Sequence, residues 1–140
     1  MYYERTLKQT LQSISETFPI LMLTGPRQVG KTTLLTKMAE PSRAYVSLDD
    51  PSARLLASQD PGLFLQRYAP PVLIDEVQYA PQLFDHIKIH ADRHKRPGDF
   101  WLTGSQTFHV MKKATESLAG RVGIVHMLGL SNSEISGCHF

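Results

Sequence analysis

The residues with the clearest chemical use form a glycine-containing loop near the start of the chain. Two glycines five positions apart are followed by a lysine and two threonines, and the segment reads Gly25, Pro26, Arg27, Gln28, Val29, Gly30, Lys31, Thr32 and Thr33. The spacing matches G-x-x-x-x-G-K-[ST], in which backbone N–H groups of the loop cradle phosphates. The loop predicts binding of a nucleoside triphosphate such as ATP. The alternative is a chance match in an ordinary strand-turn-helix connection.

Individual positions of this loop have separate expected roles. Gly25 and Gly30 allow backbone conformations that are closed to other residues. Lys31 is predicted to reach the β- and γ-phosphates, and Thr32 to offer its hydroxyl to Mg²⁺. Thr33 is expected to bond the α-phosphate, and the N-terminus of the following helix adds further donors.

A pair of acids ends a later apolar run. The Val-Leu-Ile run at 72–74 precedes Asp75 and Glu76, so it brings carboxylates to the strand end where ligands of open α/β sheets bind. Asp75 is expected to hold Mg²⁺ together with Thr32, and Glu76 to act as the base that polarises the attacking water. The alternative is two solvated acids that cap the next turn. Because a protein that only bound nucleotide would not need Glu76, the pair favours hydrolysis.

Several polar residues are weaker candidates for the same site. Thr103, Ser105 and Gln106 follow another apolar run, where they would position water or read the γ-phosphate, or cap the next helix. Arg121 is a candidate for stabilising transition-state charge, in the same chain or across a subunit boundary, and a solvated arginine at a helix end is the alternative. Arg27 is expected to be exposed, with nucleotide or a neighbouring subunit as its alternative contact.

Other clusters of charged or metal-binding residue types are interpreted as surface or capping features. His86, His90 and His94 recur every four residues, but no Cys or carboxylate pattern completes a zinc site, so a solvated helix face is expected. The basic run 93–96 suits the negative end of its own helix, with nucleic acid as the alternative partner. The acid pair at 49–50 predicts a turn and a helix cap rather than a second metal site.

The elements that must position these residues alternate along the chain. Helical stripes and short apolar runs predict helices over about 2–16, 30–39, 52–58, 64–68, 82–96 and 107–119, and strands over 20–24, 44–48, 72–74, 100–102 and 122–128. Such alternation predicts a mostly parallel five-stranded sheet with helices on both faces, the α/β three-layer class.

Length and composition fit one such domain. The chain has 140 residues, of which 41% are hydrophobic and 20% charged, and a net charge of +2 that permits an anionic ligand without demanding nucleic acid. There is one cysteine, and the longest apolar run near the N-terminus is too short for a signal peptide or a membrane span. We therefore expect a cytoplasmic protein without a membrane partner, with a domain over 1–135 and a tail over 136–140.

Five stretches together carry a family resemblance: 23–33, 45–51, 73–78, 102–105 and 117–121. They resemble the N-terminal AAA-like domain of a widespread prokaryotic ATPase family, whose members usually carry a second, C-terminal domain of unknown function. The resemblance implies a P-loop core with strand order 5-1-4-3-2 and supports the roles given to Lys31, Thr32, Asp75 and Glu76. It also makes Ser105 the expected sensor residue and favours a functional role for Arg121.

The resemblance leaves two functions open. Family members are usually more than twice this long, so we expect a fragment, a truncated product or a solitary core, with hydrolysis that is slow or depends on self-association into a homo-oligomer. The first hypothesis is a magnesium-dependent ATPase. The second is an ATP-dependent binding module or switch with negligible turnover, acting on a protein or nucleic acid, and turnover that depends on Glu76 separates the two.

Overall fold

The computed structural model describes residues 2–25, 31–104 and 108–126. Helices and strands alternate through these residues nearly as the sequence predicts. They are α1 (Tyr2–Thr17), β1 (Ile20–Thr24), α2 (Lys31–Met38), β2 (Ala44–Ser47), α3 (Pro51–Gln59), α4 (Pro61–Arg67), β3 (Val72–Asp75), the 3-10 turn η1 (Val77–Tyr79), α5 (Leu83–His94), β4 (Phe100–Gly104), α6 (Phe108–Ser117) and β5 (Val122–His126).

The strands form one five-stranded parallel sheet in the order β2-β3-β4-β1-β5. This is the predicted order 5-1-4-3-2 seen from the opposite edge, so that prediction is confirmed. β4 lies between β1 and β3, and each strand ends at the same edge as its neighbours. The carboxyl ends of β1, β3 and β4 are therefore adjacent, which places Gly25, where the glycine-containing loop begins, at the same edge as the acid pair.

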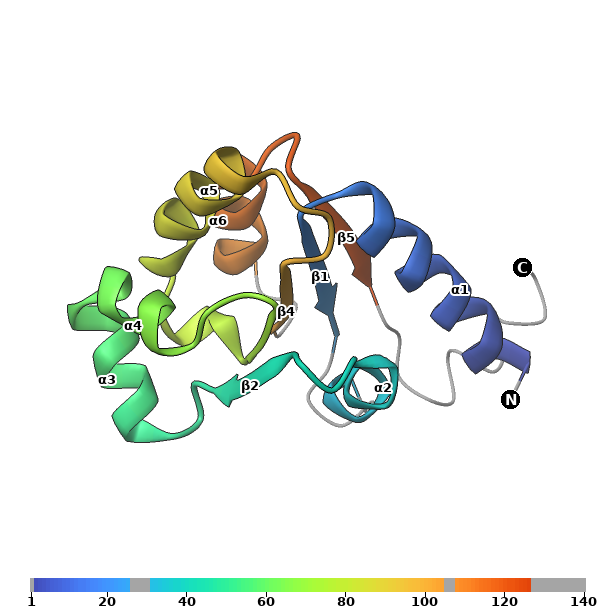
Figure 1. Cartoon of the computed structure of the whole chain (residues 1–140), viewed down its shortest axis with the longest axis horizontal. Helices are drawn as coiled ribbons and strands as arrows, with labels where there is room; N and C mark the ends of the chain where they lie inside the picture. Colours follow the sequence, from blue (N-terminus) through green and yellow to red (C-terminus); the bar gives the residue numbers. More distant parts are fainter. Residues whose placement is uncertain (1, 26–30, 105–107, 127–140) are drawn as a thin grey trace.

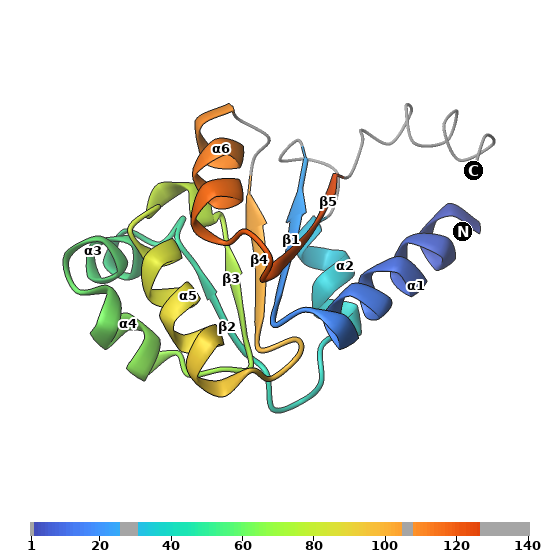
Figure 2. The ribbon, with the colours of Figure 1, turned by 90° about the horizontal axis from the view of Figure 1, so that it is seen from above.

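Helices cover both faces of the sheet, as Figures 1 and 2 show, with α1 and α2 on one side and α3 to α6 on the other. Alternate strand residues face the two sides, and both sets are buried. Ile20 and Met22 of β1 belong to the core under α3 to α6, whereas Leu21 and Leu23 belong to the core under α1 and α2. Burial on both faces explains why the strands read as continuous apolar runs.

Local signals set several helix boundaries. Asp50 caps α3 by accepting a hydrogen bond from the N–H of Ser52 at 3.0 Å, which confirms the predicted capping role of the 49–50 acid pair. Asp60 caps α4 in the same way. The helix predicted to run to 96 ends at His94, because Lys95 adopts a left-handed conformation. The turn η1 was not predicted.

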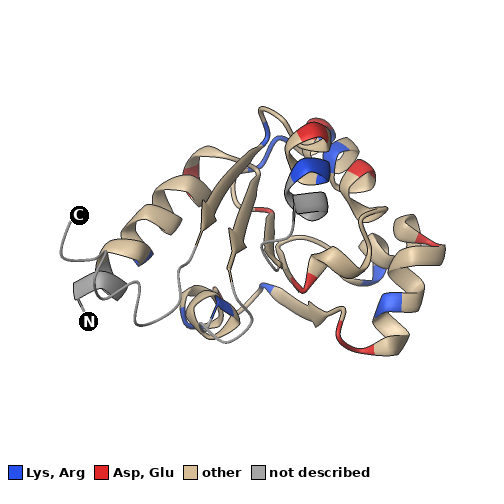
Figure 3. Cartoon of the chain, turned by 180° about the vertical axis from the view of Figure 1, so that it is seen from behind, with Lys and Arg blue, Asp and Glu red and all other residues tan. Residues whose placement is uncertain are grey.

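Charge is mixed over the surface. Figure 3 shows Lys and Arg interspersed with Asp and Glu on the helices of the face that it presents. Among the described residues, no helix combines the length and the apolar character needed to cross a bilayer.

Candidate functional site

Buried polar side chains gather at the carboxyl edge of the sheet. Six polar or charged residues are buried in the described part of the chain, and five of them lie at the ends of β1, β3 and β4 or directly beyond: Thr24, Lys31, Asp75, Glu76 and Thr103. Burying polar groups costs free energy unless they find partners, so a cluster of this kind at one edge is typical of a ligand site.

Lys31 stands at the first position of α2 and is 3% exposed. Its Nζ donates a hydrogen bond to the carbonyl of Gly25 at 2.9 Å, which brings the ammonium back to the start of the loop. Gly25 has φ 154° and donates its N–H to the carbonyl of Gly104 at 3.3 Å, so the loop begins against the end of β4. Thr33 is an exposed residue of the first turn of α2. The other predicted loop contacts lie outside the described residues: Pro26, Arg27, Gln28, Val29 and Gly30.

Asp75 is the centre of a hydrogen-bond network that joins three elements. The hydroxyl of Thr32, in α2, donates to Oδ1 at 2.8 Å. The hydroxyl of Thr103, in β4, donates to the same oxygen, and the hydroxyl of Tyr45, in β2, donates to Oδ2 at 3.2 Å. These three hydroxyls are neutral, so they satisfy the oxygen atoms of Asp75, which is 6% exposed, without supplying a counter-charge.

This donor set fits a magnesium ion. Mg²⁺ prefers oxygen ligands and is commonly held by one or two carboxylates together with substrate phosphates. The Asp75 carboxylate and the Thr32 hydroxyl supply such oxygens in direct contact. No cluster of three or more His, Cys, Asp or Glu side chains suited to a metal occurs within the described ranges, and a phosphate-bridged ion does not need one. Burial, and next the Asp75 charge, raise the pKa of Tyr45, which keeps its hydroxyl a donor.

Glu76 follows Asp75 in a left-handed backbone conformation, with φ 60° and ψ 49°. This conformation is uncommon for a residue with a side chain and occurs often at functional sites. The N–H of Glu76 donates to the Thr103 hydroxyl at 3.1 Å, and its Oε1 accepts from Nε2 of Gln78 at 2.7 Å. The side chain is therefore held beside the network of Asp75, and Glu76 is only 6% exposed.

Of the remaining predicted site residues, Arg121 lies elsewhere and one is not described. Arg121 precedes β5 at the amino edge, where its carbonyl accepts from the N–H of Ile20 at 3.2 Å and its guanidinium pairs with Asp92 at 2.5 Å. Since β1 advances about 13 Å from Ile20 to Thr24, Arg121 does not reach a phosphate beside Lys31 of the same chain. A role across a subunit boundary stays a prediction. Ser105 lies outside the described residues.

The sequence analysis assigned no site role to Tyr45 or Gln78. Tyr45 pairs with Leu73 in the sheet, two residues before Asp75 and on the same side of the strand, so its position depends on the register of β2 against β3. The alternation of side chains along adjacent strands would have indicated this contact once that register was known.

Comparisons with known proteins identify relatives of this chain. A family model described as an AAA domain matches residues 17–136. The chain is 38% identical over 119 residues to the uncharacterized proteins Rv2008c of Mycobacterium tuberculosis and Mb2031c of Mycobacterium bovis. That alignment covers 84% of this chain and 26% of each relative, so the chain spans about a quarter of their length.

Solved structures share the fold at low identity. The P-loop NTPase domain of the sigma-54 transport activator from E. coli is 16% identical with a TM-score of 0.57, covering 90% of this chain and 94% of that one. The DnaC helicase loader is 12% identical with a TM-score of 0.57, covering 89% and 90%. A DNA replication initiation factor is 15% identical with a TM-score of 0.56, covering 96% and 48%.

Proposed function

Because this chain belongs to the AAA domain family and is an AAA-type P-loop NTPase domain, we propose that it binds ATP with Mg²⁺ and hydrolyses the ATP. Two of the three structural neighbours are named for replication and helicase loading, but identities of 12–16% concern the fold alone, so we assign no nucleic-acid partner.

The contact between the Thr32 hydroxyl and the Asp75 carboxylate carries this proposal. It joins the first turn of α2 to the end of β3 at 2.8 Å, and Lys31 and Glu76 are the chain neighbours of the two residues. A buried lysine, two neighbouring oxygen donors and a second carboxylate thus lie at one edge, which supports roles in binding phosphate, holding a cation and activating water. This combination suits phosphoryl transfer to water, because that reaction needs positioning and charge stabilisation more than covalent chemistry.

Each residue has a defined part in the proposed reaction. Lys31 and the N-terminus of α2 bind the β- and γ-phosphates through charge and N–H donors. Thr32 and Asp75 would hold the magnesium ion, which neutralises charge on the phosphate oxygens when bound. Glu76 orients a water molecule and takes its proton while the water oxygen bonds the γ-phosphorus and the bond to the β-phosphate oxygen breaks. The products are ADP and inorganic phosphate.

Two paired assays on the purified chain test this function: nucleotide affinity and phosphate release, each with ATP and with GTP. We expect Glu76→Gln to retain ATP affinity within about twofold and to lose about 10²-fold or more of its turnover, since the amide accepts no proton. Lys31→Ala should weaken ATP binding about 10- to 100-fold, because a charge-assisted contact is lost.

The matched controls are Glu116→Gln and Lys113→Ala, which make the same chemical changes at exposed positions of α6. Both should leave affinity and turnover unchanged. Turnover of the Glu76→Gln variant at the wild-type rate would remove Glu76 as the base. Binding without measurable turnover in the wild type would instead favour the nucleotide-dependent switch.

A further inference from the structure

The Glu76 side chain has a single hydrogen-bond donor among the described residues, the amide of Gln78. The 2.7 Å bond from Nε2 of Gln78 reaches Oε1, and no other hydrogen bond to this carboxylate occurs in that part of the chain. A carboxylate held through one oxygen has lost most of its rotational freedom, while its other oxygen stays able to accept a proton. This is the arrangement that a general base requires.

Gln78 is itself fixed in place by the turn that contains it. The neighbouring Val77 is fully buried in the core, and its carbonyl accepts from the N–H of Ala80 at 3.1 Å. The carbonyl of Glu76 accepts from the N–H of Tyr79 at 3.2 Å, so the turn η1 starts at the base and closes over Gln78. The amide donor is therefore carried by a short rigid element rather than by a long loop.

The other end of the Gln78 amide lies against the end of β4. A Cβ added at Gly104 would stand 3.2 Å from Oε1 of Gln78, which is closer than such atoms ordinarily approach. Glycine at 104 thus leaves the space that the amide occupies. The carbonyl of the same Gly104 accepts from the N–H of Gly25 at 3.3 Å, so the residue that backs Gln78 also contacts the start of the phosphate loop.

We propose that Gln78 is a positioning residue that holds the carboxylate of Glu76 in its working orientation, and that Gly104 keeps the Gln78 amide in place. The inference rests on the proposed hydrolysis with Glu76 as base. Gln78 acts through Glu76 and contacts neither the phosphates nor the metal in this assignment. Its removal should consequently affect turnover and leave nucleotide binding intact.

The principal test is Gln78→Met, which keeps the length and packing of the side chain and removes the donor. We expect kcat to fall about tenfold, the size expected for losing a hydrogen bond to a charged group, with KM and ATP affinity within about twofold of wild type. Combined with Glu76→Gln, the same change should cause no further loss of turnover, because the carboxylate that Gln78 positions is already absent. Gln66→Met, at an exposed position of α4, is the matched control and should change nothing.

Gly104→Ala provides an independent variant that leaves the chemistry of Gln78 unchanged. The added methyl displaces the amide, so kcat should fall about threefold in the wild-type background and not at all once residue 78 is methionine. Thermal unfolding of every variant is followed in parallel, since a loss of kcat that tracks a loss of stability would mean that the bond only supports the turn.

The outcomes distinguish failure of the positioning role from failure of the proposed hydrolysis on which it rests. If Glu76→Gln abolishes turnover while Gln78→Met hydrolyses ATP at the wild-type rate, the base is correct and the role of Gln78 is wrong. An equal loss from Gln78→Met with and without Glu76 also overturns it. If Glu76→Gln retains full turnover, the base itself is wrong and the positioning role fails with it.

Discussion

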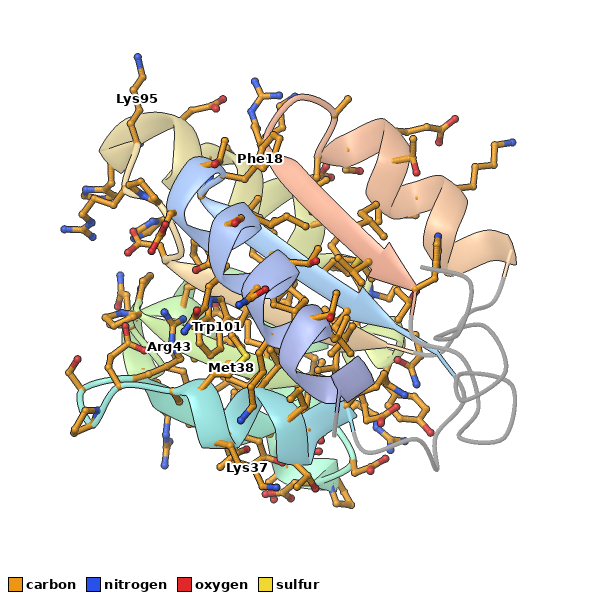
Figure 4. The ribbon with its side chains drawn as sticks, turned by 90° about the vertical axis from the view of Figure 1, so that its right-hand side faces the viewer. Phe18, Lys37, Met38, Arg43, Lys95 and Trp101 are labelled. Carbon is orange, nitrogen blue, oxygen red and sulfur yellow. The ribbon has the colours of Figure 1, made fainter. Side chains whose placement is uncertain are left out.

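The amino and carboxyl edges of the sheet both contain buried charged groups, but these groups have different partners. At the amino edge, the side chain of Arg43 is 3% exposed, and each of its three nitrogens donates at least one hydrogen bond. It pairs with Glu40 at 2.6 Å and donates to the carbonyls of Val72 at 3.3 Å and Gly98 at 2.7 Å. Its guanidinium also stacks 3.8 Å from the centre of the Trp101 ring, and Figure 4 shows the two side chains together.

At the carboxyl edge, Asp75 is buried to a similar degree, yet its hydrogen bonds come from the hydroxyls of Thr32, Thr103 and Tyr45. Hydroxyl donors satisfy the oxygen atoms without cancelling the charge. Removing a carboxylate from water without a counter-charge costs folding free energy. We therefore expect Asp75 to contribute less to stability than Arg43.

The comparison separates a structural use of charge from a functional one. Two further arginines near the amino edge also have carboxylate partners within the chain. Arg96 pairs with Asp99 at 3.0 Å, and Arg121 pairs with Asp92 at 2.5 Å. Each of those charges is therefore paired with an opposite charge of the same chain. In the proposed function, the charge on Asp75 is matched when a cation binds, and a group that is costly to bury is expected where ligand binding needs it.

Asp75→Asn should produce the largest effect and the clearest break between the edges. Magnesium-dependent ATP turnover should fall at least about 100-fold, because a neutral amide holds the ion poorly. In metal-free buffer, the free energy of unfolding should fall by no more than about 0.5 kcal/mol, or rise, since an uncompensated buried charge is removed. Urea denaturation and phosphate release measure the two quantities. A loss of stability of about 2 kcal/mol or more would show that Asp75 is structural, like Arg43.

Arg43→Met should give the opposite result. The free energy of unfolding is expected to fall by about 2–3 kcal/mol, because two backbone carbonyls and the ring of Trp101 lose a buried partner. ATP affinity per folded molecule should stay within about twofold. Arg67→Met, at an exposed position of α4, is the control and should change stability by less than about 0.5 kcal/mol. A large loss of ATP affinity in folded Arg43→Met would contradict the proposal that the charges of the amino edge serve stability and not nucleotide binding.

Tyr45→Phe should have a smaller effect, confined to the carboxyl edge. The hydrogen bond to Asp75 is 3.2 Å long and Tyr45 is 51% exposed, so its loss should raise the magnesium concentration at half-maximal nucleotide binding only about two- to threefold. Calorimetric titration of the ion in the presence of nucleotide measures this shift. Tyr68→Phe, in the segment after α4, serves as the control, and an equal shift there would remove the specific role of Tyr45.

The elements and the order of the strands could be predicted because they depend on local patterns and on a recognisable family. The apolar run at 72–74 indicates a buried strand, and an acid after it must lie at the carboxyl edge of a parallel sheet. Thr32 is carried to the same edge by the helix that follows β1. The contact between Thr32 and Asp75 is therefore the kind of feature that motif and topology specify together.

Side-chain partners across the sheet were not predictable in the same way. The bond from Tyr45 to Asp75 depends on strand register, and the bond from Gln78 to Glu76 depends on a left-handed residue and a 3-10 turn that no local pattern indicated. The burial of Arg43 could not be predicted either, because an isolated arginine after Pro41 belongs to no motif. Its burial follows from Trp101, which is distant in the chain and adjacent only in the fold.

The smallest effect is expected for the pair of Arg121 and Asp92, and it sharpens the assignment of Arg121 to the amino edge. Asp92 and Arg121 are exposed enough for solvent to screen their attraction, although the guanidinium lowers the pKa of Asp92. Arg121→Met and Asp92→Asn should each leave the free energy of unfolding close to that of the wild type. Both variants should hydrolyse ATP at the wild-type rate at protein concentrations where sedimentation shows monomers. If Arg121→Met alone loses turnover when the chains associate, Arg121 acts on the nucleotide of a neighbouring subunit, because Asp92→Asn removes the same ion pair and leaves the guanidinium in place.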